Sequence, residues 1–339
     1  MNCDIIIPVW NELRRTIECV ESILANTDYP YRIIFIDNAS EKPTADYLEG
    51  VRKMVDAQII RNKTNEGFVR AINQGLAFSK AKFVCIMNND TVTTNGWLGE
   101  MVRVAGLDKR IGVVNPSSNN LGQRSERQAI DVYAAALAGL KGQYVEMGSC
   151  VGFCMLIKRE VIEKISNFDE VYKNGNFEET DFCRRAEKAG YISVRAKAAY
   201  VYHYMKSSFV KLADYEESFR NNQEIYNRKW GKPRRLLYIV TRHHGNLLDW
   251  IGNETLAKAR GGNWVWLFFK DRAFLRMIQE HSNIKTVFIT EHFFDAKCIV
   301  RILKKKKRFD TIYADDIKLV EKIKRYKRFH QAETMLMGG

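Results

Sequence analysis

Three oxygen-bearing side chains, Asn88, Asn89 and Asp90, directly follow the apolar run Phe83–Met87. Such a run is typical of a strand buried on both faces of a parallel sheet, and open α/β sheets bind their ligands beyond the carboxyl ends of these strands. A carboxylate flanked by amide oxygens suits Mg²⁺ or Mn²⁺ held together with a diphosphate, because both ions take oxygen ligands. The alternative interpretation is a polar turn that closes the strand, since Asn and Asp are common turn formers.

A second group of carboxylates, Glu178, Glu179 and Asp181, stands at the start of a segment with a helical pattern. The helix dipole favours acidic residues in the first turn, so an acid-rich helix start without a chemical role is one interpretation. The other is a general base, because a carboxylate within hydrogen-bond reach of a hydroxyl can remove its proton. Spacing does not choose among the three, although on a helix Glu178 and Asp181 share a face and Glu179 points elsewhere. An ordinary carboxylate pKa near ~4 would keep Glu179 ionised at neutral pH.

Polar residues also follow the other strands expected in this part of the chain. Pro8 and Asn11 lie at the end of the first strand, Asp37 and Asn38 at the end of the second, and Arg61 at the end of the third. Successive sets of this kind at one edge of a sheet predict a pocket there. We expect Asp37 to accept hydrogen bonds from a pyrimidine ring N–H and a ribose hydroxyl, and Arg61 to contact the base or a phosphate. For Arg61 the alternative is a surface ion pair.

The elements that must position these residues follow from an alternation of strand and helix patterns. Strands are expected at residues 4–10, 31–37, 58–61, 83–87 and 111–115. Helices are expected at residues 11–26, with Asn11 as the cap, from residue 43 onward, and at residues 65–79. The alternation predicts a doubly wound, mainly parallel α/β sheet. Neither Gly-x-Gly-x-x-Gly nor Gly-Lys-Ser/Thr occurs, which argues against dinucleotide-binding and P-loop proteins.

Composition places the chain among globular proteins. Its 339 residues are 46% hydrophobic, enough for one large or two medium domains. No uninterrupted apolar run reaches the ~18 residues of a membrane span, and the start lacks a basic region with a cleavage site. The seven cysteines are scattered and form no CxxC pair, which favours core thiols in a reducing compartment. These features predict a cytoplasmic protein.

The charge is unevenly placed and marks a domain boundary. Residues 232–339 hold 23 Lys and Arg against 11 Asp and Glu, so they carry +12 of the net +14. With Pro233 following a helical stretch that ends at Trp230, we expect one domain at residues 1–231 and a smaller basic α/β domain at 232–339. In the second domain strands are expected at residues 236–241, 265–269, 286–290 and 310–314, and helices at 246–260, 271–281, 293–306 and 316–329.

A basic run at residues 304–308 ends one of the helices expected in the second domain. Cations at that end complement the helix dipole, and a solvated face is one interpretation. The other is attraction to anionic lipid headgroups or to an acidic glycan. The second interpretation adds peripheral contact with the inner face of the membrane to the cytoplasmic location.

Four motifs together resemble family 2 glycosyltransferases of the rhamnosyltransferase-like branch, which have the GT-A fold. They are Ile-Pro-Val-Trp-Asn at 7–11, Ile-Asp-Asn-Ala-Ser at 36–40, Asn-Glu-Gly-Phe at 65–68 and Met-Asn-Asn-Asp-Thr at 87–91. The resemblance covers about residues 3–210. It implies a donor site for a nucleotide-sugar, for which we assign the following residues: Pro8, Asn11, Asp37, Asn38, Arg61, Gly67 and Asn88.

The resemblance also implies a metal site for Mg²⁺ or Mn²⁺. Residues 88–90 occupy the place of the family's Asp-x-Asp motif, but Asn88 replaces the first Asp and leaves Asp90 as the charged ligand there. The family's matching histidine completes the metal site or contacts the diphosphate, so we assign His203 with Asp90. A segment at residues 206–208 is expected to close over the donor phosphates.

On the acceptor side, residues 148–159 resemble the family's glycine-containing strand, where small residues let the backbone approach a sugar or mark a bulge. We assign Trp97, Gly152 and Phe153 to acceptor binding. The acidic block matches the family's Glu-Asp-x-Asp motif with Glu179 in place of the second acidic residue. We therefore expect Glu179 to be the base, with Asp181 as the alternative and Glu178 holding the acceptor or orienting its neighbours.

The predicted function is a metal-dependent inverting glycosyltransferase. It would move a sugar from a UDP- or dTDP-sugar to a hydroxyl of a glycan or lipid-linked acceptor, in surface polysaccharide synthesis. One alternative is a nucleic-acid-binding α/β protein, but RNA-binding signatures are missing and the acidic block would be unexplained, so no nucleic acid is expected. The other is an inactive GT-A scaffold, since Asn88 and Glu179 depart from the family pattern.

Overall fold

The structure is a computed structural model that describes residues 2–123, 126–205, 215–242 and 245–337. It divides into two units, Met1–Trp230 and Gly231–Gly339, which are described separately. The segment 206–208, expected to close over donor phosphates, lies outside the described residues.

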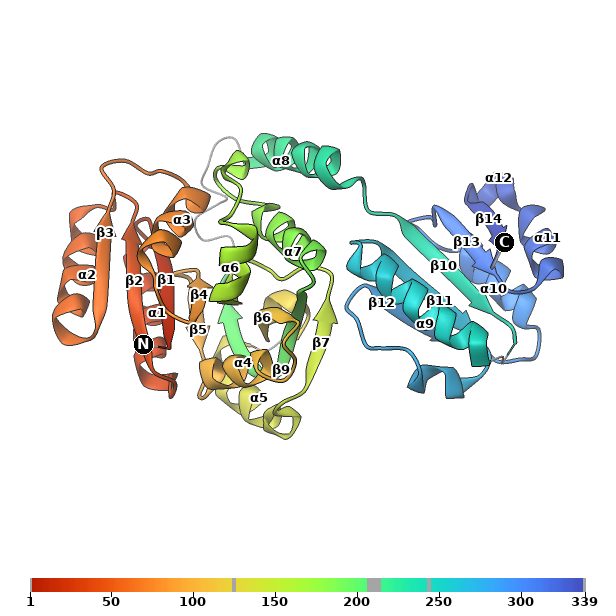
Figure 1. The fold of residues 1–339 in the computed structure, drawn as a ribbon, viewed down its shortest axis with the longest axis horizontal. Coiled ribbons are helices and arrows are strands. Elements are labelled where there is room, and N and C mark those ends of the chain that lie inside the picture. The colour runs from red at the N-terminus through yellow and green to blue at the C-terminus, as the bar shows by residue number, and fades with distance from the viewer. Residues whose placement is uncertain (1, 124–125, 206–214, 243–244, 338–339) are drawn as a thin grey trace. The chain divides into compact units, whose positions relative to one another are not determined.

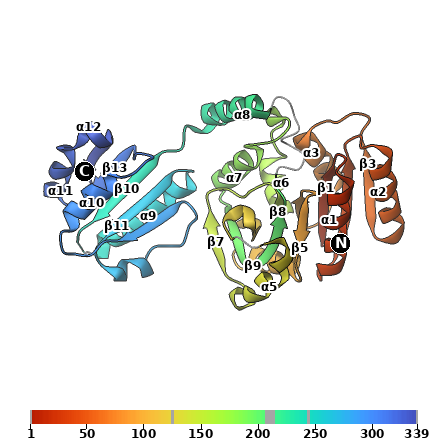
Figure 2. The same cartoon turned by 180° about the vertical axis from the view of Figure 1, so that it is seen from behind.

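A mainly parallel sheet forms the middle of the first unit (Figure 1). Its strands within the described residues are β1 (Cys3–Val9), β2 (Tyr31–Asp37), β3 (Ala57–Arg61), β4 (Phe83–Met87), β5 (Thr91–Thr93), β6 (Ile111–Ser117), β7 (Tyr144–Met147), β8 (Cys154–Lys158) and β9 (Ile192–His203). The order is β3-β2-β1-β4-β8-β6-β9-β5, with β7 also paired to β9. Neighbours from β3 to β4 are parallel, β8 is antiparallel to β4 and β6, and β5 and β7 are antiparallel to β9 (Figure 2). The predicted α/β class is confirmed.

Helices cover both faces of this sheet because its strands are apolar on both sides. In β1, Ile5 and Ile7 pack against one helix layer and Ile6 against the other. One layer holds α1 (Leu13–Asn26), α2 (Lys42–Met54) and α4 (Trp97–Ala105). The opposite layer holds α3 (Phe68–Phe78), α6 (Arg159–Ile165), α7 (Glu178–Lys188) and α8 (Tyr215–Trp230). The remaining helices in the described part of this unit are α5 (Ile130–Ala136) and the 3-10 turns η1 (Asn119–Leu121), η2 (Arg127–Ala129), η3 (Ala138–Leu140) and η4 (Glu170–Tyr172).

Two local expectations are wrong. Asn11 does not cap α1, because the N-cap residue is Glu12. The Asn11 Oδ1 instead accepts a hydrogen bond from the Glu41 N–H at 2.8 Å. The strand expected across residues 148–159 begins only at Cys154. The buried Asn115 side chain explains this, because it accepts from the Val151 N–H at 2.7 Å and donates to the Val151 carbonyl at 3.0 Å. These bonds satisfy loop groups that a strand would pair with a neighbouring strand.

The second unit is a smaller α/β fold, as expected. Its described strands are all parallel in the order β12-β11-β10-β13-β14: β10 (Arg235–Val240), β11 (Trp264–Phe269), β12 (Ile284–Phe288), β13 (Thr311–Ala314) and β14 (Glu333–Leu336). One face packs α9 (Gly245–Arg260) and the 3-10 turn η6 (Arg272–Arg276), and the other packs α10 (Phe294–Leu303) and α11 (Ile317–Lys324), followed by α12 (Lys327–His330). The helix expected at 271–281 is only a 3-10 turn, and β14 was not expected.

All seven cysteines are free and buried, which confirms the expectation of core thiols. No helix within the described residues combines the length and the apolar character needed to cross a membrane.

Candidate functional site

A cavity of about 260 Å³ opens at the carboxyl ends of β1, β2 and β4. Predicted site residues that line it are Pro8, Asn38, Gly67, Asn88, Asp90, Gly152, Phe153, Glu178, Glu179 and His203. They come from strand ends, the start of α3, the loop before β8 and the start of α7. The fold thus brings both acidic groups of the sequence to one cavity. It does not bring Asn11, Asp37, Arg61, Trp97 or Asp181 to its lining.

Asp90 and His203 face each other at one side of the cavity. The His203 Nε2 lies 3.2 Å from the Asp90 Oδ1. The backbone of His203 is fixed by Asn119, which accepts from its N–H and donates to its carbonyl, both at 2.9 Å. The imidazole stacks on Phe153 with ring centroids 5.2 Å apart. The end of β9 is therefore held rigidly beside the end of β4.

The donor set here fits a divalent cation that is shared with a diphosphate. Asn88 Oδ1 and His203 Nδ1 are buried and have no hydrogen-bond partner within the described residues. With Asp90 they supply carboxylate, amide and imidazole ligands, and Mg²⁺ commonly takes only one or two carboxylates plus substrate phosphates and water. Among the described residues there is no cluster of three or more His, Cys, Asp or Glu side chains for a cation held by the protein alone.

Glu178 and Glu179 begin α7 on the other side of the cavity. The N-cap residue Phe177 is left-handed, with φ 74°, and offers no side-chain acceptor to the first turn. Burial raises the pKa of Glu178 well above its ordinary value, and the charge of Glu179 raises it further. Burial also raises the pKa of Glu179. Hydrogen bonds from its own backbone N–H and from Glu178 lower this pKa, but burial is the larger effect. The expected ordinary pKa of Glu179 is therefore wrong.

The two carboxyl groups are unequal. The hydrogen bond between them raises the pKa of Glu178 and lowers that of Glu179. Glu178 is also the more deeply buried side chain, at 4% exposure. When the pair holds one proton, Glu178 keeps it and Glu179 is the anion.

Asp181 is engaged elsewhere. Its fully buried carboxylate contacts Arg185 Nε at 2.8 Å, Lys229 Nζ at 2.6 Å and Trp230 Nε1 at 2.8 Å. Since Lys229 and Trp230 end α8, Asp181 ties α8 to α7. These partners occupy both carboxylate oxygens, so the contacts of Asp181 are those of a structural residue in an ion cluster.

Asp37 and Arg61 form an ion pair beside the cavity. The Asp37 carboxylate is 1% exposed and also accepts from the Ser40 N–H at 2.9 Å, while Arg61 Nη2 donates to the Ser40 carbonyl at 2.8 Å. A nucleotide base that binds the Asp37 carboxylate must therefore share the two carboxylate oxygens with Arg61 and the Ser40 N–H. The guanidinium is half exposed and can turn toward a ligand.

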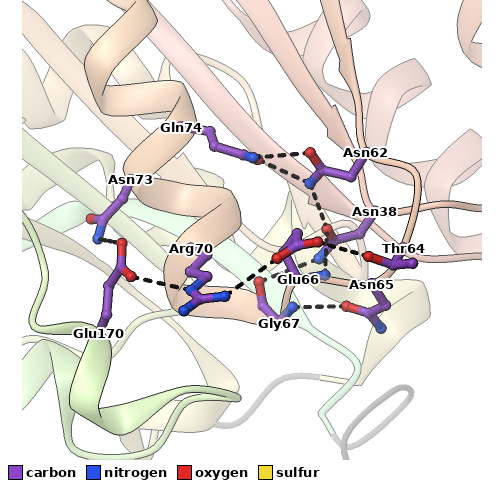
Figure 3. A network of polar contacts seen from close by, with 10 residues as sticks. All are labelled: Asn38, Asn62, Thr64, Asn65, Glu66, Gly67, Arg70, Asn73, Gln74 and Glu170. Carbon is purple, nitrogen blue, oxygen red and sulfur yellow. Dashed lines mark hydrogen bonds and ion pairs between the residues drawn. The ribbon is translucent and has the colours of Figure 1, made fainter.

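A polar network supports the start of α3 (Figure 3). Asn38 Oδ1 accepts from Asn62 Nδ2 at 2.8 Å and from the Glu66 N–H at 3.2 Å, and Asn38 Nδ2 donates to the Gly67 carbonyl at 3.3 Å. Gly67 has φ +81°, and a Cβ there would lie 2.8 Å from Asn174 Oδ1. Only glycine therefore fits where this loop approaches the segment preceding α7.

The same network continues along α3 to η4 (Figure 3). Arg70 pairs with Glu66 at 3.4 Å and with Glu170 at 3.1 Å, and Asn73 Nδ2 donates to Glu170 at 3.3 Å. These contacts link the loop after β3 to the chain that leads into the acidic block. They position both walls of the cavity relative to each other.

Of the three residues assigned to acceptor binding, two line the cavity and one does not. Gly152 and Phe153 line the cavity, and a Cβ on Gly152 would lie 3.6 Å from Glu178 Oε1. Trp97 is fully buried in the α4 layer and donates to Thr27 Oγ1 at 3.0 Å. Its indole therefore packs in the core.

Several lining residues were not predicted. They are Val9, Trp10, Asn65, Phe68, Val151, Asn174 and Asn176. Asn89, which the sequence grouped with Asn88 and Asp90, also lines the cavity. Trp10 lies within the motif at residues 7–11 and Asn65 within the motif at residues 65–68, so these two motifs could have identified them. Asn174 and Asn176 flank Gly175 directly before the acidic block, and this Asn-Gly-Asn turn is the signal that was available.

Comparison with known proteins finds a family match over part of the chain. Residues 4–166 match the model of glycosyl transferase family 2. A solved structure of GalNAc-T7 with UDP, GalNAc and Mn²⁺ has a TM-score of 0.52 at 15% identity and covers 66% of this chain and 48% of that one. This likeness confirms the GT-A-type fold.

Among curated relatives, the uncharacterized protein y4gI of Sinorhizobium fredii is 26% identical over 250 residues, which are 67% of this chain and 27% of that protein. An uncharacterized glycosyltransferase of Haemophilus influenzae is 30% identical over 105 residues, which are 30% of this chain and 32% of that protein. The matched regions thus span less than a third of the length of these relatives.

Proposed function

We propose that the first unit is a metal-dependent inverting glycosyltransferase of the rhamnosyltransferase-like branch. It moves a sugar from a UDP- or dTDP-sugar to a hydroxyl of a glycan or lipid-linked acceptor. The observation that carries the proposal is one cavity lined by Asn88, Asp90 and His203 on one side and by Glu178 and Glu179 on the other. The match of residues 4–166 to glycosyl transferase family 2 supports the same chemistry.

The proposed reaction is a single displacement. The acceptor hydroxyl attacks the anomeric carbon and passes its proton to Glu179, which acts as general base. A bond forms between the acceptor oxygen and the anomeric carbon while the bond from that carbon to the diphosphate oxygen breaks. The electron pair leaves with the nucleoside diphosphate, and the anomeric configuration inverts.

Glu178 has a positioning role in this proposal. Because it is more buried and keeps the shared proton, it donates a hydrogen bond to Glu179 and leaves that carboxylate ionised. Gly152 lies next to both side chains and leaves the space in which an acceptor hydroxyl approaches.

On the donor side, Asn38 and Gly67 line the wall where the nucleotide would lie, and Asp37 with Arg61 stands beside it. Asp90, His203 and Asn88 would hold Mg²⁺ or Mn²⁺, which would stabilise the charge on the departing diphosphate. The Mn²⁺ and UDP in the GalNAc-T7 structure are consistent with this assignment. The protein side chains orient the donor so that its anomeric carbon faces Glu179.

The wider role is proposed as surface polysaccharide synthesis in the cytoplasm. The second unit would attach the protein to the inner face of the membrane through its basic surface, close to a lipid-linked acceptor. No nucleic acid takes part.

A panel of nucleotide-sugars tests the proposal. Slow hydrolysis of one UDP- or dTDP-sugar is expected, with Mn²⁺ or Mg²⁺ required and Glu179→Gln inactive. In Asp90→Ala, Mn²⁺-dependent donor binding measured by calorimetry should be lost while the thermal unfolding profile is kept. Hydrolysis that survives chelation, or equal affinity for purine and pyrimidine diphosphates, would count against the metal site or the base preference respectively.

A further inference from the structure

We propose that the second unit binds a nucleoside diphosphate, or an ester of one, in a cleft at the carboxyl edge of its own sheet. The proposal is independent of the sugar-transfer chemistry of the first unit. It rests on the sheet order, on a cleft at the point where that order reverses, and on the side chains that line it.

The strand order β12-β11-β10-β13-β14 reverses between β10 and β13. The chain leaves β10 for β11 on one side and returns to β13 on the other, so the loops after β10 and β13 diverge at this point. In open parallel α/β sheets this is where ligands bind. Asp315 holds the two loops together, because its carboxylate accepts from the Thr241 N–H at 2.9 Å and from the Arg242 N–H at 3.0 Å.

A cleft of about 690 Å³ lies at this edge. It is lined by residues that follow β10, β11, β12 and β13, among them Thr241 and Arg242, and by residues of α10 and α11. The volume is in the range of small-molecule sites, roughly 300–1,000 Å³. A second cleft of about 450 Å³ shares Thr241, Arg242, Lys270 and Glu291 with it, so the opening runs along the sheet edge.

The lining of the larger cleft has a surplus of positive charge. Its cations are Arg242, Lys270, Lys318, Lys322 and Arg325, and its carboxylates are Glu291, Asp295 and Asp316. The carboxylates pair with three of the cations: Arg242 with Asp316 at 3.4 Å, Lys270 with Glu291 at 2.8 Å and Lys322 with Asp295 at 2.6 Å. Lys318 and Arg325 have no ion-pair partner within the described residues. Two positive charges are therefore available to an anion.

The spacing of these two cations indicates an elongated anion. Lys318 and Arg325 are seven positions apart along the α11 segment, about 10 Å along a helix axis and on one face. A diphosphate, which carries charge at both ends, suits them better than a single phosphate. Arg adds a planar pair of donors that matches phosphate oxygens.

Two further features of the cleft fit the rest of a nucleotide. Thr241 Oγ1, at the reversal point, is buried without a hydrogen-bond partner among the described residues and can donate to a phosphate or ribose oxygen. Phe293 and Tyr326 line the same cleft and are 69% and 40% exposed, which gives a base an aromatic surface on which to stack.

Hydrogen–deuterium exchange on the full chain tests the site, with UDP and with inorganic diphosphate as probes. EDTA is present to remove the divalent cation on which the first unit is proposed to depend. We expect UDP to slow exchange in α10 and α11. Protection confined to the first unit, or no protection in either unit, would overturn the proposal.

Two double variants that remove the same charge distinguish binding at the cleft from non-specific electrostatic attraction. Lys318→Ala with Arg325→Ala should lower the affinity for both probes about tenfold or more by calorimetry. Lys306→Ala with Lys307→Ala removes the same charge from exposed residues that do not line the cleft, and affinity should be unchanged. Equal losses in the two doubles would mean non-specific attraction and would contradict the site.

A third comparison concerns the base. Phe293→Ala should weaken UDP binding severalfold and leave inorganic diphosphate unaffected. Anionic lipid headgroups are the other source of phosphate chemistry. If vesicles of phosphatidylglycerol protect α11 and neither UDP nor diphosphate competes with them, the nucleotide site is refuted.

Discussion

At the scale of single residues, the roles proposed for Glu178 and Glu179 lead to a direct test. Glu179→Gln keeps the shape of the side chain and removes its basicity. We expect kcat to fall about 10²–10⁴-fold with donor affinity nearly unchanged. Steady-state kinetics with calorimetric donor binding measure both quantities.

The controls are Glu178→Gln and Asp181→Asn. Glu178→Gln should lower kcat less than Glu179→Gln. It should shift the acidic limb of the kcat/KM profile to higher pH, because the hydrogen bond from Glu178 lowers the pKa of Glu179 and an amide N–H is a weaker donor than a carboxyl O–H. Asp181→Asn should lower stability, since it weakens the contacts to Arg185 and Lys229. A collapse of kcat in Asp181→Asn beside near-normal Glu179→Gln would transfer the role of base to Asp181.

The raised pKa of Glu178 also affects stability. In the folded protein this carboxyl binds its proton more tightly than in the unfolded chain, so stability falls as pH rises from the ordinary Glu pKa through the folded-state pKa. Glu178→Gln removes this loss. It should therefore raise the unfolding free energy most above the folded-state pKa, by about 1.4 kcal/mol for each unit of pKa shift.

Urea unfolding of Glu178→Gln and wild type at about pH 4.5 and about pH 8 measures this difference. The gain should be small at the lower pH and clear at the higher one. A variant that is less stable than wild type at the higher pH would show that the ionised pair is instead favourable in the folded state.

At the scale of elements, two glycines in helices have opposite surroundings. A Cβ on Gly75 in α3 would lie 2.5 Å from Cγ2 of the fully buried Ile6, whereas a Cβ on Gly50 in α2 would meet nothing within 4 Å. Gly75→Ala should destabilise the protein by about 1–3 kcal/mol through overpacking. Gly50→Ala should stabilise it by about 0.5–1 kcal/mol, because alanine favours the helix.

Thermal or urea unfolding of the two variants checks this pair, and each is the other's control. If Gly75→Ala is as stable as wild type, α3 moves away from β1 without cost. The contact between Gly75 and Ile6 would then not define the position of α3.

The sequence predicted elements well where one strong local pattern decided them. The strands Tyr31–Asp37 and Phe83–Met87 match the expected bounds because their apolar runs end in polar turn residues. The strand expected at 148–153 failed because one buried side chain, Asn115, bonds that loop from a distance of over thirty positions. The short β5 and β7 were missed because their partner β9 lies far along the chain.

Prediction of the candidate site was limited in the same way, because contacts between distant segments cannot be read from local motifs. The motifs singled out Asn88, Asp90, Glu178, Glu179 and His203, and all five line one cavity. They did not show that Asp181 turns to the end of α8 or that Trp97 packs in the core. Direction on a helix depends on which face the sheet covers, and that depends on contacts between distant segments. The raised pKa values of the acidic pair likewise follow from burial, which spacing alone does not reveal.

At the scale of the whole molecule, charge and chemistry are divided between the units. The second unit carries nearly all of the net charge, and much of it lies in exposed side chains of α11, α12 and the run at 304–308. Not all of that run is available: Lys305 lies 4.7 Å from the Trp266 ring centroid, and burial lowers its pKa. Lys306 and Lys307 are exposed and can meet an anionic surface.

We therefore expect the protein to bind vesicles containing phosphatidylglycerol, with affinity that falls steeply between about 50 mM and about 500 mM salt as screening increases. Lys306→Ala with Lys307→Ala should weaken this binding by up to about 2 kcal/mol, roughly 30-fold, since each basic residue near a charged bilayer contributes about 1 kcal/mol. Lys53→Ala with Lys80→Ala, which removes the same charge from exposed positions of the first unit, should have little effect. Vesicle co-sedimentation measures the three proteins side by side. Equal loss in both doubles would mean that net charge alone drives adsorption, and the second unit would then have no special part in bringing the cavity of the first unit to a membrane-bound acceptor.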